Sequence, residues 1–346
     1  MALRGAFIGF GNVAAKGHLP AWRDRAGVEI VAAADTFEDR RATLAAALPE
    51  ARFYTDPAEM LARERLDFVD ICAPPGRHAA LIRLAQDAGL HTLCEKPTVT
   101  RFKDLVPLAA EARRRGLVLH SVHNWLKAPL CRKVTDLIDA AALGPVRQIE
   151  WRTLRREPAM TVSASGPANW RVDPATAGGG ILVDHGWHAL YCVARWARGG
   201  TVSGGTPVSI AAKLENRKFD DWQIEDTANV TVTFPRATAS FFLTWTAEAR
   251  ENRIEIEGAD GRLVVADDAV ILESESGRRS WTCPPALSQG SHHPDWFSGV
   301  VADLLAAIEG RTDGGNLAEA LFCAEAIAGA QASSAAGGAA VALDGS

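Results

Sequence analysis

Residues 6–14 read AFIGFGNVA, a short apolar run that meets a pair of glycines. This pattern predicts a buried strand, a tight turn and the start of a helix. Gly9 would allow the turn, Gly11 would let a pyrophosphate approach the backbone, and Ala14 is small enough for the helix to pack closely on its strand. The N–H groups and the positive dipole end of that helix would hold the phosphates.

A second signal follows in residues 29–35, which read EIVAAAD and have the pattern of another buried strand. This strand ends on Asp35, about 24 residues after Gly11. A carboxylate at roughly this spacing binds the adenosine ribose in dinucleotide-binding folds. The two stretches together predict a dinucleotide site, although in a bare βαβ unit Asp35 would only cap the next helix.

The composition of the chain bounds its class. The chain has 346 residues, of which 47% are hydrophobic, and this is enough for two domains with separate cores. A formal net charge of -5 at pH 7 argues against nucleic acid or an anionic membrane surface as a partner. We therefore expect a small-molecule substrate.

Targeting signals and cysteines give the next expectations. No secretion signal precedes the first strand, and no apolar run reaches the roughly 18 residues that cross a membrane. These features predict a cytoplasmic protein. The six cysteines are scattered without a C-x-x-C pair, which favours reduced thiols over disulfides or a zinc site. We expect no bound metal.

The order of the patterns predicts two domains of different class. Up to residue 122, apolar strand-like runs alternate with helical patterns, which indicates an α/β domain with a parallel sheet covered by helices. Beyond it, apolar and polar residues alternate within the strand-like runs, which indicates an antiparallel sheet with one wet face. Such runs occupy residues 146–152, 229–234 and 253–257. Helices are expected over residues 79–88, 102–115, 128–142, 296–308 and 317–332, and coil from residue 335.

The sharpest local motif is Glu95-Lys96-Pro97, at the end of a predicted strand. Open α/β sheets bind ligands at the carboxyl ends of their strands, so Lys96 would project toward the cofactor. Pro97 biases Lys96 toward an extended backbone and ends the strand. An ammonium group there could hydrogen-bond the substrate oxygen and stabilise the charge that develops on it during hydride transfer. The alternative is a lysine whose stem only covers the surface of the sheet.

Residues 177–188 read AGGGILVDHGWH, and a helix that begins near Gly180 would put Asp184 and His188 on one face. A histidine titrates near neutral pH, and a carboxylate can orient it or hold a substrate hydroxyl, so the pair suits acid–base chemistry. Together with His185 the two could instead bind a metal, but zinc needs a further supported ligand and none is evident. A histidine that is satisfied inside a helix interface is the other alternative.

Taken in order, these motifs resemble the Gfo/Idh/MocA oxidoreductases, the relatives of glucose–fructose oxidoreductase and inositol dehydrogenase. The match covers nearly the whole chain and comprises the glycine turn, Asp35, residues 73–78 (APPGRH), Glu95-Lys96-Pro97, Trp170-Arg171, and the triple glycine followed by Asp184 and His188. The resemblance implies a Rossmann domain over residues 1–122, and over residues 123–346 an α+β domain with a large open, mainly antiparallel sheet. It also implies NAD or NADP as cofactor.

By position, the resemblance makes Lys96, Asp184 and His188 the catalytic set, with His188 as general acid/base, Lys96 as the polarising cation and Asp184 as partner of the histidine or the substrate. His123-Asn124-Trp125 departs from the polar pair that is usual at that place. These three residues and His185 are candidates for substrate contact, with core packing as the alternative for Trp125. The candidate cofactor contacts are Gly9, Gly11, Asn12, Val13, Asp35, Arg40, Ala73, Pro74, His78, Glu95, Lys96, Trp170 and Arg171.

Charge decides between the two cofactors. The carboxylate of Asp35 would accept the ribose hydroxyls of NAD and repel the 2′-phosphate of NADP. We therefore predict NAD, while Arg40 and Arg41 leave NADP open as a second cofactor.

The resemblance implies an NAD-dependent dehydrogenase that acts on a secondary alcohol of a sugar, a cyclitol or a derivative. Two alternatives stay open. In one, NAD stays bound and supports redox-neutral glycosidase- or epimerase-type chemistry; in the other, the chain is a non-catalytic dinucleotide-binding regulator, which the complete catalytic set disfavours. The resemblance also implies a homodimer or homotetramer that forms through the sheet of the C-terminal domain.

Overall fold

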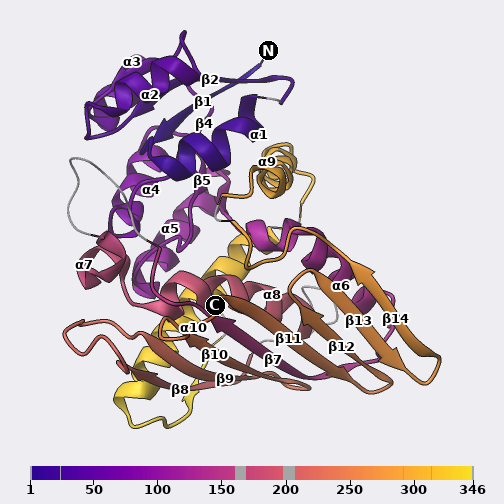
Figure 1. Cartoon of the computed structure of the whole chain (residues 1–346). Coiled ribbons are helices and arrows are strands. Elements are labelled where there is room, and N and C mark those ends of the chain that lie inside the picture. The colour runs from indigo at the N-terminus through magenta and orange to yellow at the C-terminus, as the bar shows by residue number, and fades with distance from the viewer. Residues whose placement is uncertain are drawn as a thin grey trace. The chain divides into compact units, whose positions relative to one another are not determined.

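The computed structural model describes residues 2–23, 25–159, 169–197, 207–290, 292–312 and 314–344. These residues form two compact units, whose elements are labelled in Figure 1. The first unit contains the residues up to 124 together with 292–318, and the second contains the rest of the described chain. The sequence-based division at residue 122 instead assigns residues 292–318 to the second domain.

The first unit is built on a described sheet of six strands in the order β3-β2-β1-β4-β5-β6. Its neighbouring strands are all parallel, which confirms the predicted α/β class. The order reverses beside β1, the place where ligands bind in open α/β sheets. The strands are β1 (Leu3–Ile8), β2 (Val28–Ala34), β3 (Arg52–Tyr54), β4 (Phe68–Ile71), β5 (His91–Cys94) and β6 (Leu119–Ser121).

Local sequence sets the end of α5 (Phe102–Arg115), the helix between β5 and β6. This helix ends in three arginines, which complement the negative end of the helix dipole. Gly116 then takes a left-handed conformation with φ 67°, as glycine readily does after a helix. The predicted helix over residues 102–115 is thus confirmed. The other helical segments of this unit are η1 (Val13–His18), α1 (Leu19–Arg23), α2 (Arg40–Ala47), α3 (Pro57–Arg63), η2 (Pro75–Arg77), α4 (His78–Asp87) and α9 (Pro294–Ile308).

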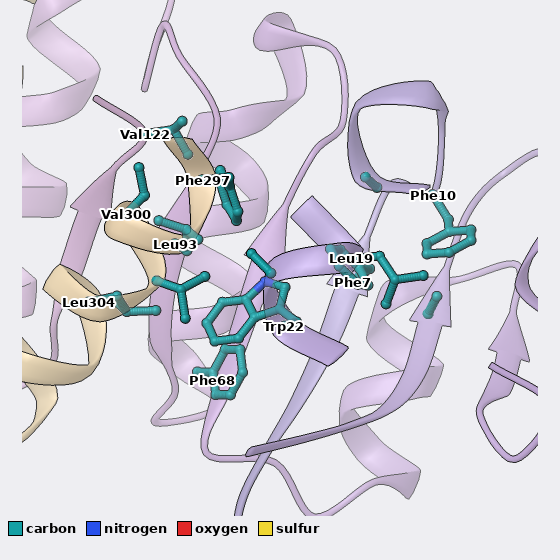
Figure 2. Close-up of a cluster of buried hydrophobic side chains, with 14 of the residues drawn as sticks. Phe7, Phe10, Leu19, Trp22, Phe68, Leu93, Val122, Phe297, Val300 and Leu304 are labelled. Carbon is teal, nitrogen blue, oxygen red and sulfur yellow. The ribbon is translucent and has the colours of Figure 1, made fainter. Parts of the chain in front are cut away.

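The core of the first unit explains why the chain returns to it. Figure 2 shows Phe297, Val300 and Leu304 of α9 in the same buried cluster as Trp22 and Phe68. The rings of Trp22 and Phe68 stack with 4.7 Å between their centroids. Burial of one such side chain contributes about 2 kcal/mol. The apolar pattern of α9 predicts that the helix has a buried face, but not which of the two cores buries it.

The second unit contains a sheet of nine described strands in the order β14-β13-β12-β11-β7-β10-β9-β8-β15. β7 and β10 run parallel, and the other neighbouring pairs among these strands are antiparallel, as predicted. The strands are β7 (Val146–Leu154), β8 (Ser209–Glu215), β9 (Thr227–Thr233), β10 (Thr238–Thr244), β11 (Glu251–Gly258), β12 (Gly261–Ala266), β13 (Ala269–Ser274), β14 (Gly277–Thr282) and β15 (Val341–Ala342).

One face of this sheet is covered by helices and the other is polar. Along β7, Ile149 and Trp151 are buried, whereas Glu150 and Arg152 are exposed, because successive side chains point to opposite faces. α8 (Trp187–Ala197) packs on β7 and β10 and can be followed in Figure 1. The remaining helical segments of the described chain are η3 (Asn124–Lys127), α6 (Pro129–Asp139), η4 (Trp170–Val172), α7 (Pro174–Ala177), η5 (Leu182–Gly186) and α10 (Gly315–Ala335).

The tail differs from its prediction. We expect coil from residue 335, but α10 extends to that residue and β15 then pairs with β8, with Val341 opposite Ile210. Leu343 is buried just after this strand. A two-residue strand is too short to show an alternating pattern, so the sequence gives no warning of it. In the structure it covers the edge of β8, which would otherwise expose unpaired backbone groups.

Two expectations from composition can be compared directly with the structure. All six cysteines lie in the described ranges and none forms a disulfide, which confirms the predicted reduced thiols. Among the helices of the described chain, none is both long enough and apolar enough to span a membrane.

Candidate active site

The glycine turn after β1 is shaped for a close approach of a ligand to the backbone. Gly9 has φ +89°, and a Cβ there would lie 2.6 Å from the backbone nitrogen of Ala73, so glycine is required. A Cβ on Gly11 would instead meet no atom of the described chain within 4 Å, which leaves open space at the turn. Asn12 precedes η1, whose first N–H groups have no acceptor inside the helix. The turn therefore fits the pyrophosphate of a dinucleotide.

Asp35 follows β2, and its carboxylate binds the backbone of the glycine turn. Oδ2 accepts the N–H of Phe10 at 2.7 Å, and Oδ1 accepts the N–H of Phe37 at 2.9 Å. A carboxylate offers about four acceptor positions, so Asp35 can also bind the two hydroxyls of a ribose. Arg40 begins α2 and has an acid beside it, with Nε 4.0 Å from Oδ1 of Asp39.

His78 connects two loops at the carboxyl ends of β4 and β5. It is fully buried, with Nδ1 2.8 Å from the carbonyl oxygen of Pro97 and Nε2 2.7 Å from that of Ala73. Both ring nitrogens therefore face carbonyls of the chain itself. His78 positions these loops, including Pro74, and a cofactor contact by His78 stays a prediction.

A buried charge network that sequence reasoning missed connects η1 to Lys96. Nδ1 of His18 lies 3.0 Å from Oδ2 of Asp70, and Nε2 lies 2.9 Å from Oε1 of Glu95. The other oxygen of Glu95 accepts the backbone N–H of Lys96 at 2.8 Å. The ring of Phe297 stacks on His18 with 3.7 Å between centroids. His18 thus fixes Glu95, and Glu95 fixes the backbone of Lys96.

The two carboxylates decide the charge of His18. Burial alone would lower the pKa of His18, but the charges and hydrogen bonds of Asp70 and Glu95 outweigh it and raise that pKa to about 9. Burial would likewise raise the pKa of Glu95, but His18 holds it below its ordinary value. His18, Asp70 and Cys72 are close enough to share a metal ion. As the structure has it, the imidazole pairs with both carboxylates, and the cluster forms an ion-pair network.

Replacement of His18 by glutamine is expected to remove a pH-dependent part of the stability. The folded-state pKa of about 9 lies above the unfolded value near 6.5. The contribution of protonated His18 is therefore complete below about pH 6.5 and is lost as the pH rises through about 9. That interval corresponds to roughly 3 kcal/mol. As the pH rises from about 6.5 to about 9, the free energy of unfolding measured with urea should fall more for the wild type than for the variant. Equal falls would contradict the assignment.

In the second unit, Gly180, the last glycine of the triple, lies so close to the backbone of Glu225 that no larger residue fits there. A Cβ on Gly180 would overlap the backbone oxygen of Glu225. Ile181 donates its N–H to that oxygen at 3.2 Å, and Leu182 donates its N–H to Oε1 of Glu225 at 3.0 Å. Glu225, which the sequence did not single out, therefore holds the turn that leads to Asp184.

The helix predicted from Gly180 begins as the π-helical turn η5 and continues as α8. A π-helical turn is wider than an α-helical one, so the expected i,i+4 geometry between Asp184 and His188 does not carry over directly. Asp184 pairs with its neighbour His185, whose Nε2 lies 3.8 Å from Oδ2 of the carboxylate. Both side chains are half-buried, whereas His188 is buried on α8.

His188 is held by a phenol and an indole. Its Nδ1 lies 2.7 Å from Oη of Tyr191, and the same oxygen accepts the backbone N–H of Trp125 at 3.1 Å. The indole of Trp125 stacks on the imidazole with 4.4 Å between centroids and 5° between planes. Sequence reasoning missed Tyr191, because within the apolar run of α8 it has the pattern of a core residue. The arrangement fixes the position and the tilt of the imidazole.

Trp125 also continues an aromatic stack. Its ring lies 6.0 Å from that of Trp151, which in turn lies 5.8 Å from that of Trp196. Trp125 is 6% exposed. The core-packing alternative therefore describes Trp125, whose indole also covers His188, and a substrate contact by Trp125 stays a prediction.

The two residues before Trp125 belong to the first unit. Asn316 accepts the N–H of Ser121 at 2.7 Å and donates to its carbonyl oxygen at 3.0 Å. Nδ2 of the same amide lies 3.3 Å from Nδ1 of His123, so the fold holds this buried histidine. Asn124 has a buried Oδ1 that accepts no hydrogen bond within the described chain. Such an atom is uncommon in folded proteins, and Asn124 remains a candidate for substrate contact.

Trp170 and Arg171 fold against each other in η4. The guanidinium of Arg171 lies 4.4 Å from the centroid of the Trp170 ring, and its Nη1 donates to the carbonyl oxygen of Ala159 at 3.4 Å. Asn169 caps this turn by accepting the N–H of Arg171 at 3.3 Å. Both side chains are half-buried. A cofactor contact by this pair stays a prediction.

The predicted residues fall into one set for each unit. The first unit brings the glycine turn, Asp35, the Ala73 loop and Glu95-Lys96 to the carboxyl ends of its parallel strands. The second unit brings Trp125 onto His188 and pairs Asp184 with His185. The first set fits a dinucleotide, and the second set fits a proton-transfer site.

Comparison with known proteins agrees with this division. Residues 3–123 match the family model described as an oxidoreductase family with an NAD-binding Rossmann fold, and residues 131–264 match the GFO/IDH/MocA C-terminal domain. A solved structure of levoglucosan dehydrogenase in complex with NADH and levoglucosan aligns with a TM-score of 0.84 at 19% identity, over 99% of this chain and 100% of that one. This likeness shows the same fold.

Two curated relatives are dehydrogenases by name. D-apiose dehydrogenase from Paraburkholderia graminis is 30% identical over 296 residues, which cover 83% of this chain and 74% of that protein. D-glucoside 3-dehydrogenase from Escherichia coli is 30% identical over 190 residues, 54% of this chain and 52% of that protein. Together with the two domain matches, these similarities show that the chain belongs to the Gfo/Idh/MocA family of NAD-binding oxidoreductases.

Proposed function

We propose that the chain is an NAD-dependent dehydrogenase that transfers a hydride between nicotinamide and a secondary alcohol or ketone of a sugar, a cyclitol or a derivative. The observation that carries this proposal is the fixed imidazole of His188, with Tyr191 at Nδ1 and Trp125 on its face. A histidine held in this way suits proton exchange with a substrate hydroxyl. The names of the two curated relatives support a sugar-like substrate.

Each member of the catalytic set has a separate task. His188 takes the hydroxyl proton of the alcohol, and Lys96 hydrogen-bonds the same oxygen and stabilises its negative charge. Asp184 is the partner of a substrate hydroxyl or of His188. Bound NAD supplies the hydride acceptor. Lys96 belongs to the first unit, and Asp184 and His188 belong to the second.

The cofactor would be held by groups whose geometry is suited to it. Gly11 and the N–H groups at the start of η1 would bind the pyrophosphate, and Asp35 the adenosine ribose. The proposal is tested by incubating the protein with NAD and a panel of sugars, cyclitols and their acids while following absorbance near 340 nm. A rise with one substrate class supports it, and no rise with any of them overturns it.

Replacement of Asp35 by alanine is expected to narrow the preference for NAD over NADP. The variant loses the carboxylate that accepts the ribose hydroxyls and repels a 2′-phosphate, so kcat/KM with NAD should fall about 10- to 100-fold. The matched control is Asp39→Ala, which removes an acid beside Arg40. Arg41 pairs with Glu38 in the wild type and is partly neutralised there. The assignment fails if wild-type kcat/KM with NADP equals or exceeds that with NAD.

We also propose that the chain forms a homodimer or homotetramer through the polar face of the second sheet. On this face Arg152, Lys213, Asn229 and Phe242 line a hollow of about 690 Å³ across four neighbouring strands. The guanidinium of Arg152 lies 5.9 Å from the ring of Phe242. A broad face that mixes aromatic and charged groups suits a second copy of the same face. Sedimentation velocity at micromolar concentration should give a dimer or larger; a monomer would remove the proposal.

A further inference from the structure

Tyr191 is one of two tyrosines in the chain, and it is fully buried on α8, one turn after His188. Its phenolic oxygen lies between two nitrogens, 2.7 Å from Nδ1 of His188 and 3.1 Å from the backbone nitrogen of Trp125. The indole of Trp125 lies flat against the imidazole. The phenolic oxygen of Tyr191 thus contacts His188, the proposed acid–base group. The same oxygen hydrogen-bonds the backbone of Trp125, whose indole covers that group.

The direction of these hydrogen bonds decides which ring nitrogen can take a proton. The backbone N–H of Trp125 can only donate, so it uses one lone pair of the phenolic oxygen. The second lone pair can accept Nδ1–H of His188 when the phenolic O–H points away from both nitrogens, and this arrangement leaves Nε2 of the neutral ring unprotonated and basic. If the phenol donated to Nδ1 instead, the proton of the neutral ring would be on Nε2, and Nε2 could not accept another.

We propose that Tyr191 is a positioning residue whose oxygen accepts Nδ1–H of His188 and thereby assigns proton uptake to Nε2. Because this inference rests on the proposed function, the step follows from it: the substrate O–H bond breaks, an Nε2–H bond forms on His188, and the Nδ1–H bond to Tyr191 persists. The imidazolium then has one proton on each nitrogen, and the reverse reaction returns the proton from Nε2.

Tyr191 is a neutral partner for His188, unlike the carboxylate that often orients a catalytic histidine. Burial raises the pKa of the Tyr191 phenol well above its ordinary value, so the group stays protonated at working pH. Phenylalanine at this position would keep the ring and its packing and would remove only the oxygen. The buried N–H groups of Trp125 and His188 would then lose their shared acceptor, and loss of a buried acceptor of this kind lowers activity by about 10- to 100-fold.

The first test is kinetic and uses Tyr191→Phe with a matched control. The control is Tyr54→Phe, which removes the other phenolic oxygen of the chain, in the first unit, where it donates to Glu64 at 2.6 Å. We expect kcat/KM of Tyr191→Phe to fall about 10- to 100-fold with an unchanged KM for NAD, and that of Tyr54→Phe to stay within about twofold of the wild type. A Tyr191→Phe value within about twofold of the wild type overturns the proposal.

The second test observes directly which ring nitrogen of His188 carries the proton, and it does not need turnover. In the full-length protein labelled with ¹⁵N-histidine, the signals of His188 are assigned among the nine histidines by their loss in His188→Asn. We expect the proton of the neutral ring on Nδ1 in the wild type and a mixture of both tautomers in Tyr191→Phe. A wild-type ring with its proton on Nε2, or identical spectra, overturns the proposal. If the wild type oxidises no alcohol, the proposed function fails, and this spectrum still decides the role of Tyr191.

Discussion

Replacement of His188 by asparagine is expected to lower kcat about 1,000-fold while the protein still folds and binds NAD. Asparagine can keep a hydrogen bond to Tyr191, but it cannot take up a proton at neutral pH. His188 is 6% exposed and stacks against the indole of Trp125. Steady-state turnover and a fluorescence titration with NADH measure the two quantities separately.

A second histidine provides the control for this experiment. His91 lies at the start of β5, the strand whose other end leads to Lys96, and its Nδ1 accepts the N–H of Val118 at 3.0 Å. His91→Asn should keep kcat within about twofold of the wild type, because this histidine has a structural partner and no place in the site. Near-normal turnover in a folded, NADH-binding His188→Asn protein would contradict the acid–base assignment.

Replacement of Lys96 by methionine is expected to lower kcat about 100- to 1,000-fold. Methionine keeps most of the length of the side chain and removes the ammonium that stabilises charge on the substrate oxygen. Glu95 accepts the backbone N–H of residue 96, which the substitution keeps, so the hydrogen bonds that join Glu95 to His18 and to this backbone should persist in the variant. The loss should therefore appear in turnover more than in stability. Stopped-flow measurement of the hydride-transfer step separates it from product release.

Lys103 supplies the matched control, because it is an exposed lysine on α5. Lys103→Met should leave kcat within about twofold of the wild type. The double variant Lys96→Met/His188→Asn adds a test of whether the two residues act together. If both residues act on one substrate oxygen, the double variant should lose much less than the product of the two single losses. Fully multiplicative losses, or normal turnover in Lys96→Met, would contradict a shared role.

The parts of the fold that local sequence specifies were predictable. Gly9, Gly11 and Asp35 predict the turn between β1 and η1 and its acid, and the structure joins them through the hydrogen bond from Phe10 to Asp35. α5 was predictable because its arginines and Gly116 are local end signals. The alternation of apolar and polar residues in β7 predicts a sheet with one polar face. In each case the necessary information lies within a few neighbouring residues.

The features that sequence missed depend on contacts between distant segments. His18 meets Asp70 from 52 positions away and Glu95 from 77, so neither its charge nor its effect on Lys96 follows from its own surroundings in the sequence. Tyr191 lies in a helix with an apolar composition, where a tyrosine has the pattern of core packing. η1 and η5 are π-helical turns, which the 3.6-residue repeat does not predict.

The return of α9 to the first core is a further case of this kind. Its apolar residues predict a buried face over residues 296–308, and the structure confirms a helix there. Phe297 packs on His18, so this helix closes the network that fixes Lys96. Sequence periodicity identifies a buried face but not its partner, and this is why the division at residue 122 leaves α9 in the other domain.

The most direct test of the central claim is the number of NADH molecules formed per molecule of oxidised product, measured together with a mass spectrum of the nucleotide released when the purified protein is denatured. A freely exchanging NAD-dependent dehydrogenase predicts one NADH for each oxidised product. Product formation with tightly retained NAD and no net NADH would contradict this account and would indicate redox-neutral chemistry at the same residues.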